Sequence, residues 1–402
     1  MTDFTALPDL ASRLLGGGAV ACNDEFFAAA DNLVSPEPAV FHPKTFGAKG
    51  QVYDGWETRR RRDPGHDWVI VRLGVPGVIR GAVIDTAFFT GNFPPYASLD
   101  GCTVDGYPSP PELAACSWSP LVERSSLVGD ARNPFPVESE SRFTHVRLSI
   151  YPDGGVARLR VHGEPAPDPE LVALGGLTDL AAVENGGMVV GCSNMFYGSP
   201  GNLLLPGLAR TMGEGWETAR RRDDGNDWVL VRLGLPGVVR LAELDTSHFK
   251  GNAPGWAQLT GFAADGTPVS LMDRTRLQPD TRHVLAVSPG PLVSCVRLDA
   301  FPDGGLSRVR VIGGIDPAAR VLVGYQWFNT LPENQAVQCL ADSGVPADLA
   351  AEVAAQRPVA EPWLDDFRRR AADAAAGTER AAAEAACLRS LTAMLEGQPA
   401  QP

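Results

Sequence analysis

An arginine-rich motif occurs twice in this 402-residue chain and supplies two groups of side chains that could do chemistry. The motif reads GWETRRRR from Gly55 and GWETARRR from Gly215. An arginine can bind a carboxylate or a ureido oxygen through its N–H donors. The acidic residues beside each arginine run could hold the guanidinium groups in place, accept N–H groups of a urea-like ligand or transfer protons. The motifs therefore predict a polar site for a small ligand.

The two copies offer different groups for proton transfer. Copy one has His66 where copy two has Asn226, and copy two has His248 and Lys250 where copy one has a phenylalanine and a threonine. Such asymmetry would follow if the duplication left one site for each pair of copies. The predicted catalytic residues are His66, Glu57, His248 and Lys250. The predicted substrate-binding residues are Arg60, Arg61, Asp67, Glu217, Arg220, Arg221, Asp227 and Asn252.

A structural role for the same residues is the alternative. Clusters of arginine and acidic residues often form salt bridges that fix a loop to the edge of a sandwich. In this interpretation His248 is a loop histidine without a role, and the PDGG segments from Pro152 and Pro302 are chain-reversing turns. The presence of the whole arginine motif in both copies favours a functional site, although folding alone could also maintain it.

The motifs belong to a long internal repeat. Residues 54–101 align without a gap with residues 214–261, and 30 of the 48 positions are identical. The offset between the copies falls along the chain, which indicates shorter surface loops in the second copy. Two further matching pairs are 144–163 with 294–313 and, more weakly, 21–36 with 191–206.

Each copy has the residue pattern of a β-sandwich. DWVIVRLG and VIRGAVIDT are rich in β-branched residues, and a Gly-x-Pro-Gly turn is predicted between them. ARLRVHG and SRVRVIG alternate apolar residues with arginine, as half-buried strands do. Strands that recur about every 8–12 residues indicate a sandwich or jelly roll. We therefore predict a mainly β protein with two tandem jelly-roll domains, 1–168 and 169–318.

The residues from 319 to 402 have a different composition. Runs such as NQAVQCLADSG and PADLAAEVAAQRP are rich in alanine, the residue with the highest helix propensity. We predict a small α-helical C-terminal segment over 319–402.

Charge and cysteine content limit the partners and the compartment. A net charge of −13 gives no overall attraction to nucleic acid or to an anionic membrane, so neither is expected as a partner. The seven cysteines form no C-x-x-C pair, and the first residues lack a secretion signal. We expect reduced thiols and a cytoplasmic protein. The six histidines form no metal-binding pattern, and no cofactor motif occurs, so neither a metal nor a cofactor is predicted.

Taken together, the motifs resemble those of the allantoicase family. The resemblance covers about residues 20–315 and depends on GWETRRRR, GHDW, DTAFFTGN, GWETARRR, GNDW, DTSHFKGN and the paired PDGG turns. It implies two galactose-binding-like jelly rolls and a hydrolase of purine metabolism that converts allantoate to ureidoglycolate and urea during allantoin degradation. Allantoate would be the small-molecule partner, and we expect a homo-oligomer. Ala219 departs from the pattern because it interrupts the second arginine run.

The tail resembles a different family. FNTLPENQAVQCLADSGVPADLAAEVAAQRP is similar to the opening helices of the ureidoimidazoline (OHCU) decarboxylase family, which acts upstream in the same pathway. The catalytic histidine of that family should lie further along, but no histidine follows His283. We therefore expect a module for structure or assembly that has no decarboxylase activity.

The allantoicase resemblance suggests a mechanism. Loss of urea from allantoate requires a proton on the leaving nitrogen and water at the central carbon. Arg60 and Arg220 are expected to fix the carboxylate, and His66 or Glu57 to act as acid or base, with the histidine and lysine of copy two completing the site. Two rival functions remain open. One is a galactose-binding-like module that binds a ligand without turnover, and the other is a pathway scaffold that docks through its helical tail.

Overall fold

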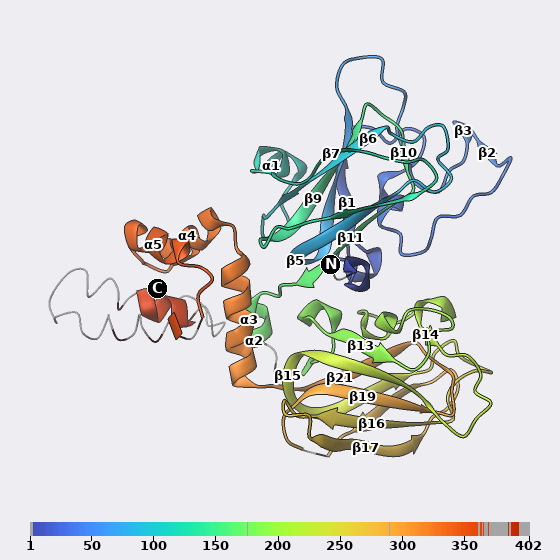
Figure 1. Cartoon of the computed structure of the whole chain (residues 1–402), viewed down its shortest axis with the longest axis vertical. Helices are drawn as coiled ribbons and strands as arrows, with labels where there is room; N and C mark the ends of the chain where they lie inside the picture. Colours follow the sequence, from blue (N-terminus) through green and yellow to red (C-terminus); the bar gives the residue numbers. More distant parts are fainter. Residues whose placement is uncertain are drawn as a thin grey trace. The chain divides into compact units, whose positions relative to one another are not determined.

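This computed structural model describes residues 3–174, 176–288 and 290–360 and, further on, 362–363, 365, 369, 385 and 387–393. The chain forms two compact units, Met1–Ala166 and Pro167–Pro402 (Figure 1). The first unit ends close to the predicted boundary at residue 168, and the C-terminal helices fall within the second unit. Much of the predicted helical segment after residue 369 lies outside the described residues.

The first unit is an antiparallel β-sandwich, here called repeat one. Its main sheet has the strand order β1-β5-β9-β6-β7, and β8 and β11 pair with β5 outside that path. Val146, Leu148 and Ile150 of β9 are fully buried and alternate with more polar residues, which is the pattern of a core between two layers. The strands are β1 (Gly18–Cys22), β2 (Phe46–Gly47), β3 (Gly50–Gln51), β4 (Trp56–Glu57), β5 (Asp67–Asp85), β6 (Tyr96–Cys102), β7 (Ser119–Ser126), β8 (Arg132–Pro136), β9 (Arg142–Tyr151), β10 (Gly155–Val156) and β11 (Arg158–Pro165).

One long strand, β5, belongs to both layers of repeat one. From Asp67 to Arg72 it pairs with β1 and β9, and its second half pairs with β8 and β11 as far as Asp85. The prediction of two strands separated by a turn is therefore wrong. The chain stays extended here and pairs with β11, and Gly77 permits the close approach of that strand: a Cβ on Gly77 would lie 2.3 Å from the carbonyl oxygen of Glu164.

The second unit contains the same sandwich, here called repeat two. Its long strand β15 pairs with β19 so that Asp227 lies opposite Ala300, just as Asp67 lies opposite Ile150 in repeat one. The prediction of two tandem β-sandwiches is confirmed. The strands are β12 (Thr178–Asp179), β13 (Met188–Cys192), β14 (Trp216–Glu217), β15 (Asp227–Asp245), β16 (Trp256–Phe262), β17 (Pro268–Arg276), β18 (Arg282–Ala286), β19 (Val293–Phe301), β20 (Gly305–Leu306) and β21 (Arg308–Ile315).

Helices follow the second sandwich, as the alanine-rich composition predicts. They share a small apolar core in which Phe328 and Leu340 pack with Cys387 and Leu391. The α-helices are α1 (Pro110–Ala115), α2 (Pro169–Leu174), α3 (Pro317–Thr330), α4 (Glu333–Asp342) and α5 (Ala347–Ala355). Short 3₁₀ helices span Phe4–Ala6, Arg13–Leu15, Ala30–Val34, Val183–Asn185, Pro200–Leu204 and Met212–Glu214.

Candidate active site

A buried tryptophan anchors each arginine motif to its sandwich. Trp56 and Glu57 form β4, which pairs with β10 so that Glu57 lies opposite Gly155. The indole of Trp56 is fully buried and donates from Nε1 to the carbonyl oxygen of Asp24 at 2.8 Å. Trp216 is equally buried and makes the equivalent hydrogen bond in repeat two, at 2.9 Å. This anchor fixes where the glutamate and the arginines leave the core.

The glutamate of each motif is held by an asparagine from a separate loop. Asn92 donates from Nδ2 to Glu57 Oε1 at 2.7 Å, and Asn252 donates to Glu217 Oε1 at the same distance. Burial raises the pKa of the half-buried Glu57, against the hydrogen bond from Asn92, which lowers it. Glu57 therefore retains a proton to higher pH than an exposed glutamate. The sequence prediction included Asn252 but missed Asn92, although both follow a glycine at the same place in the repeat.

The PDGG turns lie beside the arginine runs. Asp153 Oδ2 accepts a hydrogen bond from the backbone N–H of Arg61 at 2.8 Å, and Asp303 accepts one from Arg221 at the same distance. These turns were interpreted from the sequence as chain reversals. Their aspartates also order the arginine runs, which was missed because each pair is more than 80 residues apart in the chain: 92 in repeat one and 82 in repeat two.

A buried aspartate binds one arginine of each run. Asp67 is 1% exposed and accepts hydrogen bonds from Arg61 Nη1 and, at 3.0 Å, from Asn23 Nδ2. In repeat two, Arg221 Nη1 donates to Asp227 Oδ1 at 2.8 Å. The structure thus brings together two predicted pairs, Arg61 with Asp67 and Arg221 with Asp227.

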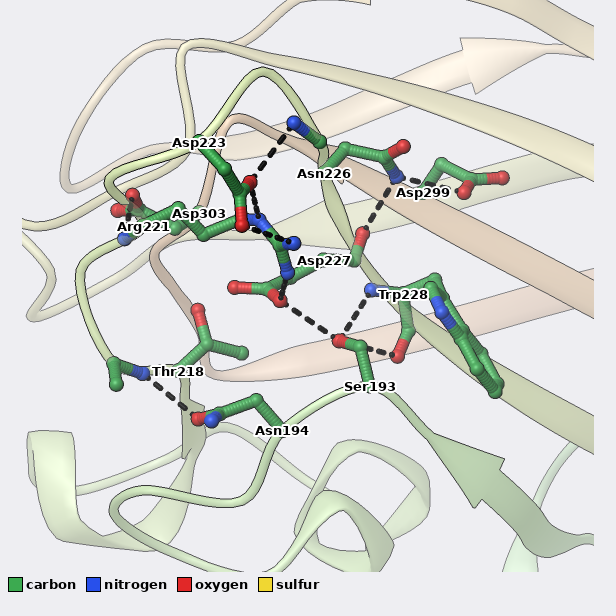
Figure 2. Close-up of polar contacts among 12 residues, drawn as sticks. Ser193, Asn194, Thr218, Arg221, Asp223, Asn226, Asp227, Trp228, Asp299 and Asp303 are labelled. Atoms are coloured by element: carbon green, nitrogen blue, oxygen red, sulfur yellow. Dashed lines mark hydrogen bonds and ion pairs between the residues drawn. The ribbon is translucent and has the colours of Figure 1, made fainter.

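Figure 2 shows the cluster of repeat two, in which two carboxylates point at one guanidinium group. Asp227 contacts Arg221 Nη1, and Asp223 contacts Nε and Nη2 at 2.9 and 3.1 Å. Ser193 Oγ donates to Asp227 Oδ1 at 2.9 Å. The sequence prediction missed Ser193, because its counterpart in repeat one is Asn23 and no shared residue type marks the position.

Arg60 and Arg220, the predicted first choices for binding a carboxylate, are exposed. Neither has a hydrogen bond or an ion pair with any other residue in the described part of the chain. Their N–H donors are therefore available to a ligand.

His66 lies against Tyr151, with 4.7 Å between the ring centroids. Burial, together with the positive charges of Arg147 and Arg61, lowers the pKa of the imidazole. The ring is therefore neutral at pH 7 and can accept a proton. Among the described residues, no hydrogen-bond partner contacts either ring nitrogen.

The structure gives His248 and Lys250 partners outside the Arg221 cluster. His248 Nε2 lies 2.9 Å from the carbonyl oxygen of Ala209. The side chain of Lys250 is 79% exposed, and its Nζ lies 3.8 Å from Asp280. Within the residues that the structure describes, neither side chain has a hydrogen bond or an ion pair with the cluster drawn in Figure 2.

Two further observations concern metal ions and membrane spans. Over the described ranges, no three histidine, cysteine or acidic side chains are grouped to hold a metal ion. In the same ranges, no helix has the length and apolar character needed to cross a membrane. The seven cysteines, all of which lie in the described ranges, are not joined in disulfides.

Comparisons with known proteins give consistent matches. The allantoicase repeat family matches residues 8–166 and 178–316. A probable allantoicase of Nocardia farcinica is 60% identical over 313 residues, which cover 77% of this chain and 95% of that protein. A probable allantoicase of Streptomyces coelicolor is 49% identical over 80% of this chain and 90% of its own length. The crystal structure of allantoicase from Saccharomyces cerevisiae matches with a TM-score of 0.67 and 36% identity, covering 76% of this chain and 92% of that chain.

The family match covers both sandwiches and includes both arginine motifs with their bound aspartates. The chain therefore belongs to the allantoicase family.

Proposed function

We infer that this protein is an allantoicase, which hydrolyses allantoate to ureidoglycolate and urea. The similarity of both repeats to allantoicases, up to 60% identity over nearly the whole length of a relative, carries this conclusion. In allantoate one carbon bears a carboxylate and two ureido groups. The reaction breaks one of its C–N bonds, adds water at the carbon and transfers a proton to the leaving nitrogen.

Glu57 is our first choice for the proton donor. Its pKa is raised by burial, and the hydrogen bond from Asn92 fixes the orientation of its carboxyl group. A positioned acid whose pKa lies closer to neutrality transfers a proton more effectively. His66, which is neutral and has no partner for its ring nitrogens in the described residues, would accept the proton of the attacking water.

Arginines would bind the substrate carboxylate. Arg60 and Arg61 supply donors in repeat one, where Asp67 holds Arg61 in place. A second site in repeat two would consist of Glu217, Arg220, Arg221, Asp227 and Asn252, and it would require Asp223 to leave Arg221. His248 and Lys250 would be the proton-transfer groups of that repeat, although His248 must first release the carbonyl of Ala209.

Urea release from purified protein and allantoate tests the proposed function, with ammonia measured in parallel. Urea and ureidoglycolate without ammonia are expected. A folded sample that releases neither product, with or without added divalent cations, would instead favour a binding module of the same fold.

Assembly and location are further parts of the proposal. We propose a homo-oligomer in the cytoplasm, and cysteines that are not joined in disulfides are consistent with a reducing compartment. The helices after the second sandwich have an apolar core of their own, as an assembly module would. Their resemblance to the OHCU decarboxylase family would then reflect a shared helical scaffold without its activity. Deletion of residues 319–402 should lower the oligomeric mass measured by light scattering and retain urea release.

A further inference from the structure

The two repeats differ at the arginine that binds the buried aspartate. In repeat two, Asp223 covers the Nε–Nη2 edge of Arg221, with contacts of 2.9 and 3.1 Å (Figure 2). This is the two-bond geometry in which arginine binds a carboxylate. The hydrogen bonds from Arg221 lower the pKa of Asp223, which is therefore ionised at neutral pH. Because Asp227 occupies Nη1, Arg221 has carboxylates on two sides.

In repeat one, the same edge of the arginine has no carboxylate partner among the residues that the structure describes. Arg61 donates from Nη1 to Asp67, but its Nε is buried without a hydrogen-bond partner among the described residues. Asp63, the counterpart of Asp223, is exposed and makes neither a hydrogen bond nor an ion pair within those residues. A buried N–H without a partner is unfavourable, so this edge is suited to an acceptor from a ligand.

The residue after the aspartate also differs between the two repeats. Asp223 Oδ1 also accepts a hydrogen bond from the backbone N–H of Gly225 at 2.9 Å, which turns the carboxylate back over the loop. Repeat two has Asp224 between these residues, whereas repeat one has Pro64. A proline restricts the residue before it to extended conformations. Pro64 therefore limits the backbone conformations that are open to Asp63, whereas Asp223 has no such restriction.

The position just before the buried aspartate also has a side chain that is bound within the protein in repeat two and has no partner among the described residues in repeat one. Asn226 in repeat two donates to Asp299 Oδ1 at 2.8 Å, so its amide is bound within the protein. His66 occupies this position in repeat one, and its ring nitrogens have no partner among the described residues. Burial is the main cause of the lowered pKa of His66, and the positive charges of Arg147 and Arg61 lower it further, so these arginines contribute a positive potential at this place. Repeat one thus combines free donors with a field that attracts an anion.

We propose that the Nε–Nη2 edge of Arg61 binds the carboxylate of allantoate, and that Asp223 closes the equivalent site of repeat two from within. The identity of the ligand rests on the proposed function. Asp223 acts as a built-in mimic of the substrate, because it occupies the arginine edge with a carboxylate in the two-bond geometry. Of the two arginines that bind a buried aspartate, Arg61 is then the one whose Nε–Nη2 edge has no carboxylate partner in the described part of the chain.

Exchange of the loop residue tests this inference without altering Arg61. Pro64→Asp gives repeat one the acidic pair of repeat two, so that Asp63 can turn onto Arg61 and compete with the substrate. The KM for allantoate should rise about tenfold or more, with kcat within about threefold, because carboxylate binding is lost equally from the ground and transition states. The matched control, Asp224→Pro in repeat two, should leave both constants within about twofold of wild type.

A second variant removes the two N–H donors, Nε and Nη2, of Arg61. Arg61→Lys keeps a positive charge for Asp67 but lacks the planar fork of a guanidinium group. KM for allantoate should again rise about tenfold or more. Inhibition by methylenediurea, which has two ureido groups and no carboxylate, should stay unchanged. Circular dichroism and thermal melting establish that each variant is folded.

A folded Pro64→Asp or Arg61→Lys protein with the KM of the wild type would overturn the inference, as would an equal rise in KM for Asp224→Pro. The proposed function fails separately, if the wild-type protein binds allantoate but releases no urea. Calorimetric Kd values for allantoate then replace KM, and the same comparison of variants decides whether Arg61 binds the carboxylate.

Discussion

Asn92 donates a 2.7 Å hydrogen bond to the half-buried carboxylate of Glu57 across 35 residues of sequence. The bond fixes the direction of the carboxyl group while burial raises its pKa. Orientation and a raised pKa are the two properties that a general acid needs.

Glu57→Gln should lower kcat by about 100-fold or more, because a glutamine cannot supply a proton to the leaving nitrogen. The amide keeps the size of the side chain and can still accept the hydrogen bond of Asn92. Urea release at saturating allantoate measures the effect, and undiminished turnover would exclude Glu57 as the acid. The same change at Glu217 reports whether repeat two contributes to turnover.

Asn92→Asp should shift the alkaline limb of the pH–rate profile upward by about one pH unit or more, because a second carboxylate beside Glu57 raises its pKa further. An acid is active while protonated, so activity is lost as the pH rises through its pKa. A higher pKa therefore moves that loss to higher pH. An alkaline limb at the wild-type position, in a folded variant, would mean that Glu57 does not control it.

His66→Asn places the residue of repeat two in repeat one and should lower kcat by about 100-fold. The pKa of His66 is lowered from about 6.5, so the imidazole is the free base above that lowered value and is lost as a base when the pH falls through it. The wild-type profile should therefore have an acidic limb below about pH 6.5 that the variant lacks. Wild-type turnover in the variant would remove His66 from the mechanism.

His145 should make the stability of repeat one depend on pH. The ring is buried beside Thr144, and burial lowers its pKa to about 4. Below about pH 6.5 the unfolded chain binds a proton that the folded chain does not, so the free energy of unfolding falls with pH until the folded form also protonates. The total loss is on the order of 3 kcal/mol.

The measurement is urea unfolding at about pH 7 and about pH 5, where part of this loss has developed. Repeat two has Cys295 at the matching position. His145→Cys is therefore the matched variant, and its unfolding midpoint should change less between the two pH values. An equal change in both proteins would show that other groups cause the pH dependence.

The internal repeat made most of the fold predictable. Because DWVIVRLG and its copy recur with the same turn residues, both sandwiches follow from one interpretation of the pattern. The Gly-x-Pro-Gly segment was misjudged, because its composition is that of a turn, whereas its pairing with β11, which brings Glu164 close to Gly77, is visible only in the fold. Short helices such as α1 (Pro110–Ala115) were not predicted, because six residues give too little periodicity.

The sequence was enough to predict the charged residues of the candidate site that lie within one motif. It was not enough to predict the residues from distant loops that bind them. Arg61 and Asp67 lie six residues apart, so one motif contains both members of the pair. Asn92 and Asp153 come from distant loops, and only the fold brings them to the motif. Asp223 binds Arg221, whereas Asp63 has no arginine partner among the described residues, and this difference between the repeats is visible only in three dimensions.

The long strand β5 has a consequence for local opening. Val69 and Val71 lie in the half that pairs with β9, and Ile84 lies in the half that pairs with β8 and β11. Neither layer can separate without breaking hydrogen bonds of this one strand. Amide hydrogens in both halves should therefore exchange with solvent only in a shared opening event, at the same rate and with the same dependence on denaturant, so that the two layers form a single cooperative unit.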